Sequence, residues 1–139
     1  MFMKQLFFLT FVLVLSACGA SSPKTGADRD AQGCIASAGY TWSSVAGDCL
    51  RLWEAGVRLQ NAQDAQATAS AFVIISADGS LTELFLPQGE PVVLNRTITP
   101  DGPIWKKGDL RLERMPDGWF LYQKDLLIYQ AGNPPDASR

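Results

Sequence analysis

The run Leu110-Arg-Leu-Glu-Arg114, the turn Pro116-Asp117-Gly118 and the run Trp119-Phe-Leu-Tyr122 decide the fold class of this chain. Apolar and charged residues alternate in the first run, which is typical of a strand with one buried face and one solvent-exposed face. Pro, Asp and Gly between the two runs are the residues that favour a tight turn. The segment therefore predicts a strand, a turn and a returning strand.

The same pattern of short apolar runs and turns covers the chain from Ala71 onward. Asp78-Gly79 is a hairpin signal, and the breaker from Pro100 to Pro103 separates two later runs. Turn signals recur at intervals of about 7–14 residues, which favours an antiparallel sandwich or a small closed barrel. We expect a mainly β fold of about six to eight short strands. The expected strands are 72–75, 81–86, 92–94, 96–99, 104–105, 110–114, 119–122 and 126–129.

Two segments before these strands have weaker patterns. Residues 60–70 are polar and rich in Ala, with no apolar periodicity, so we expect a long mobile loop there and not a packed helix. Residues 50–59 are compatible with one helical turn or with a strand, and the sequence does not decide between them.

The first residues have the composition of an export signal. Lys4 supplies a positive charge, an apolar stretch runs from Leu6 to Leu15, and small residues precede Cys18. The apolar stretch is shorter than the roughly 20 residues that a membrane-spanning helix needs. The ending Leu15-Ser-Ala-Cys18 resembles the bacterial lipoprotein signal. This resemblance implies that Cys18 becomes the lipidated first residue of the mature chain.

The signal and the composition together predict the organisation of the chain. Residues 1–17 are a lipoprotein signal peptide, and residues 18–33 form a lipid-anchored flexible tether because they contain no large apolar side chain. Residues 34–132 form a single β-rich domain, and residues 133–139 are a frayed tail. Gly19 follows Cys18 where Asp would retain a lipoprotein at the inner membrane, which resembles the outer-membrane sorting pattern of enteric bacteria. We therefore expect a lipid-anchored protein of the cell envelope, at the outer membrane and facing the periplasm.

Cys34 and Cys49 are the only cysteines besides Cys18. An exported compartment permits disulfides, so the pair is most simply one bridge that closes an N-terminal segment. A closed loop of about 15 residues would stabilise the fold by roughly 3 kcal/mol in the chain-entropy model. The alternative is a metal pair, but the sequence offers no further Cys and no His to complete such a site.

The composition argues against several classes of function. The chain contains no His, which removes His-assisted Ser or Cys nucleophiles and the commonest metal ligand. The formal net charge is −2 with dispersed basic residues, which is not typical of a nucleic-acid-binding protein. The acidic residues lie mostly beside turns, where Asp bonds its own backbone. We expect a binding protein with no catalytic residues, cofactor or metal; a glycosidase using two carboxylates is the enzyme alternative. The turn residues are Asp78, Asp101, Asp117 and Asp125.

The cysteine loop carries an aromatic motif. Cys34, then Gly39-Tyr40-Thr41-Trp42-Ser43, then Cys49-Leu-Arg51 resembles a segment of uncharacterised bacterial lipoproteins over residues 34–59. The resemblance implies family membership and brings no activity with it. Tyr40, Trp42 and Trp53 are typical packing anchors over a disulfide. Alternatively, Tyr40 and Trp42 form a binding or assembly site for another envelope component.

Residues Leu84 to Asp109 resemble the membrane-bound inhibitors of C-type lysozyme, which are small lipoproteins with a flattened antiparallel barrel. The matching pieces are Gln88-Gly89, Arg96 and Trp105-x-Lys107-Gly108-Asp109. In that family a loop Ser and the Lys of a Trp-Ser-Lys-Gly-Asp motif reach the carboxylates of the lysozyme cleft. The resemblance implies that Lys107 has this role.

The match is incomplete in three places. Lys106 stands where the family has the Ser of its motif, Val93-Leu94 replaces the loop Ser-Gly, and the barrel-linking cysteines are missing. From the residues alone, two lysines at a hairpin tip are either a positive knob able to enter an acidic cleft or a solvated turn built on Gly108. The expected inhibitor-like binding residues are Lys107, Arg96, Trp105, Lys106 and Asp109.

Overall fold

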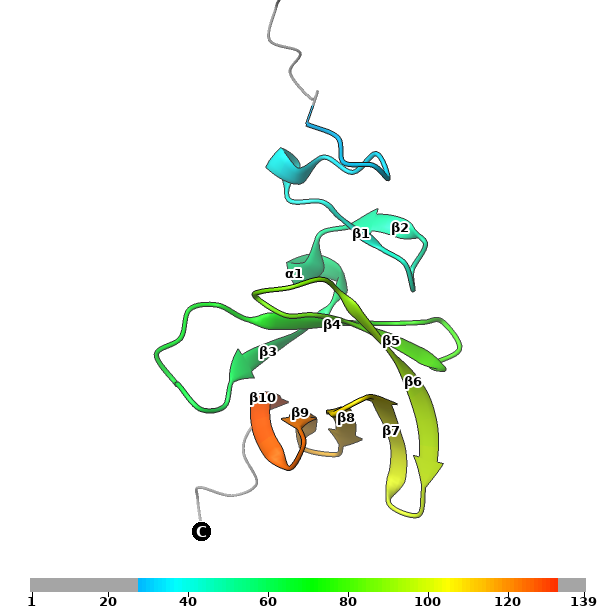
Figure 1. Cartoon of the computed structure of the whole chain (residues 1–139), viewed down its shortest axis with the longest axis vertical. Helices are drawn as coiled ribbons and strands as arrows, with labels where there is room; N and C mark the ends of the chain where they lie inside the picture. The colour runs from blue at the N-terminus through cyan, green and yellow to red at the C-terminus, as the bar shows by residue number, and fades with distance from the viewer. Residues whose placement is uncertain (1–27, 133–139) are drawn as a thin grey trace, which may run out of the picture.

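Eight antiparallel strands close into a barrel in the computed structural model, which describes residues 28–132 (Figure 1). The predictions for Cys18, the signal peptide and residues 133–139 lie outside the described residues. The structure confirms the mainly β antiparallel barrel. In chain order the barrel strands are β3 (Val57–Asn61), β4 (Ala71–Ile75), β5 (Leu81–Phe85), β6 (Val92–Thr99), β7 (Gly102–Lys107), β8 (Leu110–Met115), β9 (Gly118–Gln123) and β10 (Leu126–Gly132).

Several strand boundaries differ from the expected ones. β6 is one continuous strand, because Asn95 pairs with Leu81 on one side and with Lys106 on the other. Residues 50–59 contain both expected alternatives, since the helical turn α1 (Leu52–Ala55) is followed directly by β3. Residues 62–70 connect β3 to β4 without a helix, as the polar composition predicts, but Gln60 and Asn61, which were expected in this loop, belong to β3 because they pair with β10.

The barrel interior is filled by alternate residues of the strands. In β8, Leu112 is fully buried, whereas its neighbours Arg111 and Glu113 lie on the outer face and form an ion pair at 2.9 Å. This is the alternation that places one face of each strand in the core. The core residues are Leu59, Ala71, Val73, Leu84, Leu94, Trp105, Leu112 and Leu121.

Antiparallel connectivity gives the barrel two distinct ends, because successive connections alternate between them. We call the end that carries the connections 76–80, 100–101 and 116–117 the closed end. The opposite end carries the connections 62–70, 86–91, 108–109 and 124–125, and we call it the open end. The barrel closes where β10 meets β3 through the pairs Tyr129–Asn61 and Gln130–Gln60.

A small unit precedes the barrel and lies outside it, beyond β4 and β5 (Figure 1). It contains the 3₁₀ turn η1 (Ala36–Ala38), the hairpin of β1 (Thr41–Ser43) with β2 (Asp48–Leu50), and α1. A disulfide joins Cys34 to Cys49 with a Cα–Cα distance of 5.5 Å, which confirms the predicted bridge. Within the expected tether, residues 28–33 form a turn in which Asp30 Oδ1 accepts from the Cys34 amide at 2.8 Å. The flexibility of the tether stays a prediction.

Glu83 attaches this unit to the barrel. Its side chain lies on the outer face of β5 and is 3% exposed. The carboxylate accepts hydrogen bonds from Ser43 Oγ at 2.5 Å and Ser44 Oγ at 2.8 Å, and from the Ser44 and Val45 amides at 3.2 Å. A buried carboxylate is costly unless its lone pairs are used in this way. The hairpin turn therefore supplies the donors that Glu83 needs, and Glu83 holds the hairpin against the sheet.

Within residues 28–132, no helix combines the length and the apolar character required to cross a membrane.

Candidate functional site

The β7–β8 turn, which carries the expected inhibitor-like residues, projects at the open end. Lys107 pairs with Leu110 at the base of the turn, and Gly108 has a φ of 56°, a conformation that favours glycine. Lys106, Lys107 and Asp109 are all exposed. Neither lysine takes part in an ion pair among the residues that the structure describes. Lys107 therefore does not fold back onto Asp109 or Glu113.

Trp105 lies inside the barrel and not on the binding surface. It is 4% exposed, and its ring centroid is 5.6 Å from that of Trp119. The indole Nε1 donates a hydrogen bond to the Gly79 carbonyl at 2.9 Å. A buried Trp with its polar atom satisfied is a rigid anchor. Trp105 thus fixes β7 two residues before Lys107.

Arg96 lies toward the closed end, away from the lysine turn. It pairs in register with Trp105, and its guanidinium Nη1 lies 3.4 Å from the Asp78 carbonyl oxygen. The structure therefore brings together Lys106, Lys107 and Asp109, which share one turn, but it does not bring Arg96 into that group.

The neighbouring turn supports the lysine turn. The amide of Lys124, in the β9–β10 turn, donates to the Asp109 carbonyl at 2.8 Å. Lys124 has a φ of 56°, which is uncommon for a residue with a side chain. The two turns at the open end are thus joined by a backbone hydrogen bond, which limits the motion of the segment that carries Lys107.

Asp78 behaves as turn chemistry predicts. Its carboxylate accepts from Ser76 Oγ at 2.7 Å, from the Ser80 amide at 3.0 Å and from Ser80 Oγ at 2.7 Å. The Ser76 bond, followed by those from Ser80, holds the pKa of this exposed carboxyl well below its ordinary value of 3.8. Asp28 has a lowered pKa for a similar reason, with Ser37 as its partner. These carboxylates accept hydrogen bonds that shape local structure.

No group of three or more acidic or Cys residues that could hold a metal occurs within residues 28–132. A hollow of about 340 Å³ on the outer face of β7 and β8 contains Asp101 and Glu113. Glu113 is engaged by Arg111 in the ion pair described above. We therefore assign no catalytic carboxylate pair to this surface.

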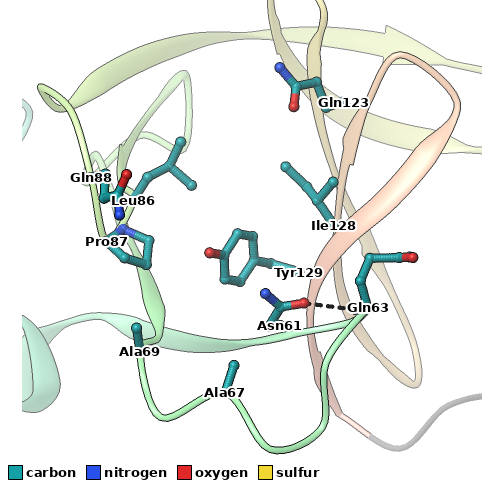
Figure 2. A pocket seen from close by; sticks show the side chains of 10 residues that line it. All are labelled: Asn61, Gln63, Ala67, Ala69, Leu86, Pro87, Gln88, Gln123, Ile128 and Tyr129. Carbon is teal, nitrogen blue, oxygen red and sulfur yellow. Dashed lines mark hydrogen bonds between the residues drawn. The ribbon is translucent and has the colours of Figure 1, made fainter.

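The sequence did not reveal a cavity of about 460 Å³ at the open end (Figure 2). We call it the mouth cavity. Its walls are the end of β3, the 62–70 loop, the segment after β5, the end of β9 and the start of β10. Its polar side chains are those of Asn61, Gln63, Gln88, Gln123 and Tyr129, and its apolar ones are those of Ala67, Ala69, Leu86, Pro87 and Ile128.

A β-bulge in β10 shapes the mouth cavity. Successive residues of a regular strand point to opposite faces, yet the consecutive residues Ile128 and Tyr129 both line the cavity. The register between β10 and β9 shifts between Leu127 and Tyr129, which accounts for this arrangement. Bulges concentrate at barrel rims and beside functional sites, where they redirect side chains.

The aromatic residues of the cysteine loop are packed to different degrees. Tyr40 is half-buried, and the Arg51 guanidinium lies over its ring at 4.7 Å. Trp42 is half-buried and pairs in register with Cys49. Trp53 is 59% exposed, but its ring lies so close to Gly39 that any Cβ there would overlap it. These contacts favour packing for Tyr40 and Trp42.

No protein-family model matches this chain, and no match was found among curated proteins or among solved structures. Its function is therefore inferred from the side chains and their geometry.

Proposed function

We propose that this protein is a lipid-anchored binding protein of the bacterial cell envelope that inhibits C-type lysozyme. One observation carries the proposal. Lys107 is exposed, forms no ion pair within residues 28–132, and stands two residues after the buried anchor Trp105. A cation on a fixed turn is suited to enter an acidic cleft in another protein.

The chemistry of the proposed target fits a lysine. Lysozyme uses two carboxyl groups that flank the scissile bond of its substrate. An ammonium group placed between them would pair with negative charge in a site from which water is excluded, where the attraction is stronger than in bulk water. Because Lys107 forms no ion pair among the described residues, it would break no salt bridge on binding and would give up hydration and side-chain freedom.

The barrel is consistent with the resemblance to lysozyme inhibitors, whose fold is a flattened antiparallel barrel. The segment that replaces the family's loop Ser-Gly has no equivalent donor, because the side chains of Val93 and Leu94 carry no hydroxyl group, and Leu94 is fully buried in the core. Binding would therefore depend mainly on Lys107, with the exposed Lys106 as a second positive charge.

Replacing Lys107 tests the proposal directly. Purified protein is titrated into a lysozyme assay, and Lys107→Ala should weaken inhibition by at least about tenfold, or 1.4 kcal/mol. Lys124→Gly is the matched control, since it removes an ammonium group from the adjacent turn at a backbone conformation that glycine accepts. Its inhibition should stay within about twofold of the wild type.

Two results would count against the proposal. Full lysozyme activity in excess wild-type protein would exclude inhibition altogether. Equal inhibition by the wild type and Lys107→Ala would exclude Lys107 as the inserted group, even if the protein binds lysozyme through another surface.

A further inference from the structure

We propose that the mouth cavity is a binding site for a neutral saccharide. At about 460 Å³ it falls within the roughly 300–1,000 Å³ typical of small-molecule sites. The mouths of β-barrels are among the places where such sites occur. The inference does not depend on lysozyme inhibition, because Lys107 does not line the cavity.

Two polar groups in the cavity are positioned by the barrel closure. Asn61 Oδ1 accepts hydrogen bonds from the Gln63 amide at 2.8 Å and the Asp64 amide at 3.0 Å, which fixes the orientation of the side chain. Its Nδ2 then lies on the side of Tyr129 (Figure 2). Asn61 and Tyr129 are directly paired across the β3–β10 seam, so both belong to the barrel wall.

These groups have hydrogen-bonding capacity left for a ligand. Within residues 28–132, neither Asn61 Nδ2 nor the Tyr129 hydroxyl makes a hydrogen bond. Gln88 and Gln123 are exposed at the rim. An amide side chain both donates and accepts, as does a phenol, and a sugar hydroxyl also needs a donor and an acceptor. The lining therefore matches a ligand with many hydroxyl groups.

The remaining lining selects against other ligands. None of the side chains that line the cavity is charged, so an anion would find no cation and a metal ion would find no carboxylate. An entirely apolar ligand would cover the half-buried Asn61 Nδ2 and Tyr129 hydroxyl without pairing them, which is unfavourable. Leu86, Pro87 and Ile128 provide apolar surface for the C–H face of a sugar ring. A neutral saccharide satisfies both kinds of surface.

Loop 62–70 is held in place around the cavity. Gln63 Nε2 donates to the Leu127 carbonyl at 2.8 Å, and the Ala62 amide donates to the Ile128 carbonyl at 2.9 Å. These bonds attach the start of the loop to Leu127, just before the bulge in β10, and to Ile128, within it. The small residues Ala67 and Ala69 face the space that remains, so the loop borders the cavity without filling it (Figure 2).

The test is an NMR titration of the isotope-labelled full chain with two neutral probes, tri-N-acetylglucosamine and maltotriose. We expect saturable shifts in the side-chain amide signals of Asn61, Gln88 and Gln123 with at least one probe. Shifts with the first probe alone would show that the acetamido group is recognised; shifts with both would show that the hydroxyl groups suffice. The absence of saturable shifts with either probe would overturn the proposal.

A bulky substitution in the 62–70 loop tests whether the saccharide binds in the mouth cavity or on the outer surface. Ala69→Trp fills the cavity from an exposed position and should weaken binding by about tenfold or more. Ala65→Trp is the matched control, because Ala65 lies in the same loop but lines an outer hollow, and its affinity should stay within about twofold. Unchanged affinity in Ala69→Trp would overturn the proposal.

Two further variants keep the test independent of folding and of the lysozyme proposal. If the NMR spectrum of Ala69→Trp shows that this variant is unfolded, the rim variant Gln88→Ala/Gln123→Ala is used in its place. It should weaken saccharide binding about fivefold. Unchanged affinity in this rim variant would likewise count against the site. Lys107→Ala should bind the saccharide as the wild type does, so loss of lysozyme inhibition with retained sugar binding separates the two functions.

Discussion

At the closed end of the barrel, Trp105 packs against Trp119 and donates a hydrogen bond to the Gly79 carbonyl, so that the polar and apolar parts of its ring are both satisfied. At the open end, the side chains of Gln88 and Gln123 are exposed and border a cavity of about 460 Å³. Trp105, whose ring reaches the closed end, therefore has no polar atom left to offer a partner, whereas Gln88 and Gln123 at the open end do.

This difference assigns separate tasks to the two ends. Residues that interact with each other stabilise the barrel, and residues that lack internal partners are available for binding. Lys107 and the mouth cavity both belong to the open end. The comparison predicts that substitutions at the closed end change stability, while substitutions at the open end change binding.

The largest expected effect is that of Trp105→Ala at the closed end. Removal of a buried Trp leaves a cavity in the core and an unpaired Gly79 carbonyl, and should lower the free energy of unfolding by about 3–5 kcal/mol. Urea denaturation measures this change. Trp53→Ala, at a Trp that is 59% exposed, is the control and should cost much less. A loss below about 1 kcal/mol in Trp105→Ala would contradict the assignment of the closed end as the part of the barrel that determines stability.

A smaller effect on stability is expected from Asp78→Asn, in the turn whose Gly79 carbonyl accepts the hydrogen bond from Trp105. The folded-state pKa of Asp78 is lowered, so its contribution is present above the ordinary value of 3.8 and is lost as the pH falls toward the folded-state pKa. The stability difference between the wild type and Asp78→Asn should therefore shrink between about pH 5 and pH 2. Denaturation at several pH values tests this.

Asp117→Asn provides the control for that experiment, because Asp117 lies in another closed-end turn and its carboxylate accepts no hydrogen bond within residues 28–132. Parallel pH curves for Asp78→Asn and the wild type would contradict the assignment of Asp78 as a turn-stabilising carboxylate.

The smallest effect on stability is expected at the open end. The double variant Gln88→Ala/Gln123→Ala should change the free energy of unfolding by no more than about 0.5 kcal/mol, since both residues are exposed and neither side chain makes a hydrogen bond within residues 28–132. Thermal and urea denaturation measure this. A loss comparable to that of Trp105→Ala would mean that the open end is also a stabilising element, and the contrast between the ends would fail.

The barrel and the disulfide were predictable because both depend on local patterns. Alternation in Leu110–Arg114 identified a strand with one buried face, and Asp78-Gly79 identified a hairpin turn. Two cysteines 15 residues apart offered one simple pairing. The lysine turn was also visible, since two lysines, a Gly and an Asp lie together in the chain.

The mouth cavity and the Glu83 contacts were not predictable from local patterns. The cavity depends on the pairing of Asn61 with Tyr129, which only the closure of the barrel brings together. The bulge that places Ile128 and Tyr129 on the same wall has no distinctive residue. Glu83 resembles any outward-facing charge in a strand, and its partner Ser43 is 40 residues away.

The Cys34–Cys49 disulfide has a mechanical consequence if the chain is pulled from its amino-terminal side. Tension entering at Cys34 passes through the sulfur atoms to Cys49, then along α1 into β3. Residues 35–48 lie outside this path, and they include Ser43, Ser44 and Val45, whose hydrogen bonds fasten the hairpin to Glu83. A pull on the amino terminus would therefore not stretch the backbone of residues 35–48, so the segment that supplies the donors to Glu83 would stay folded while the covalent crosslink transmits the force.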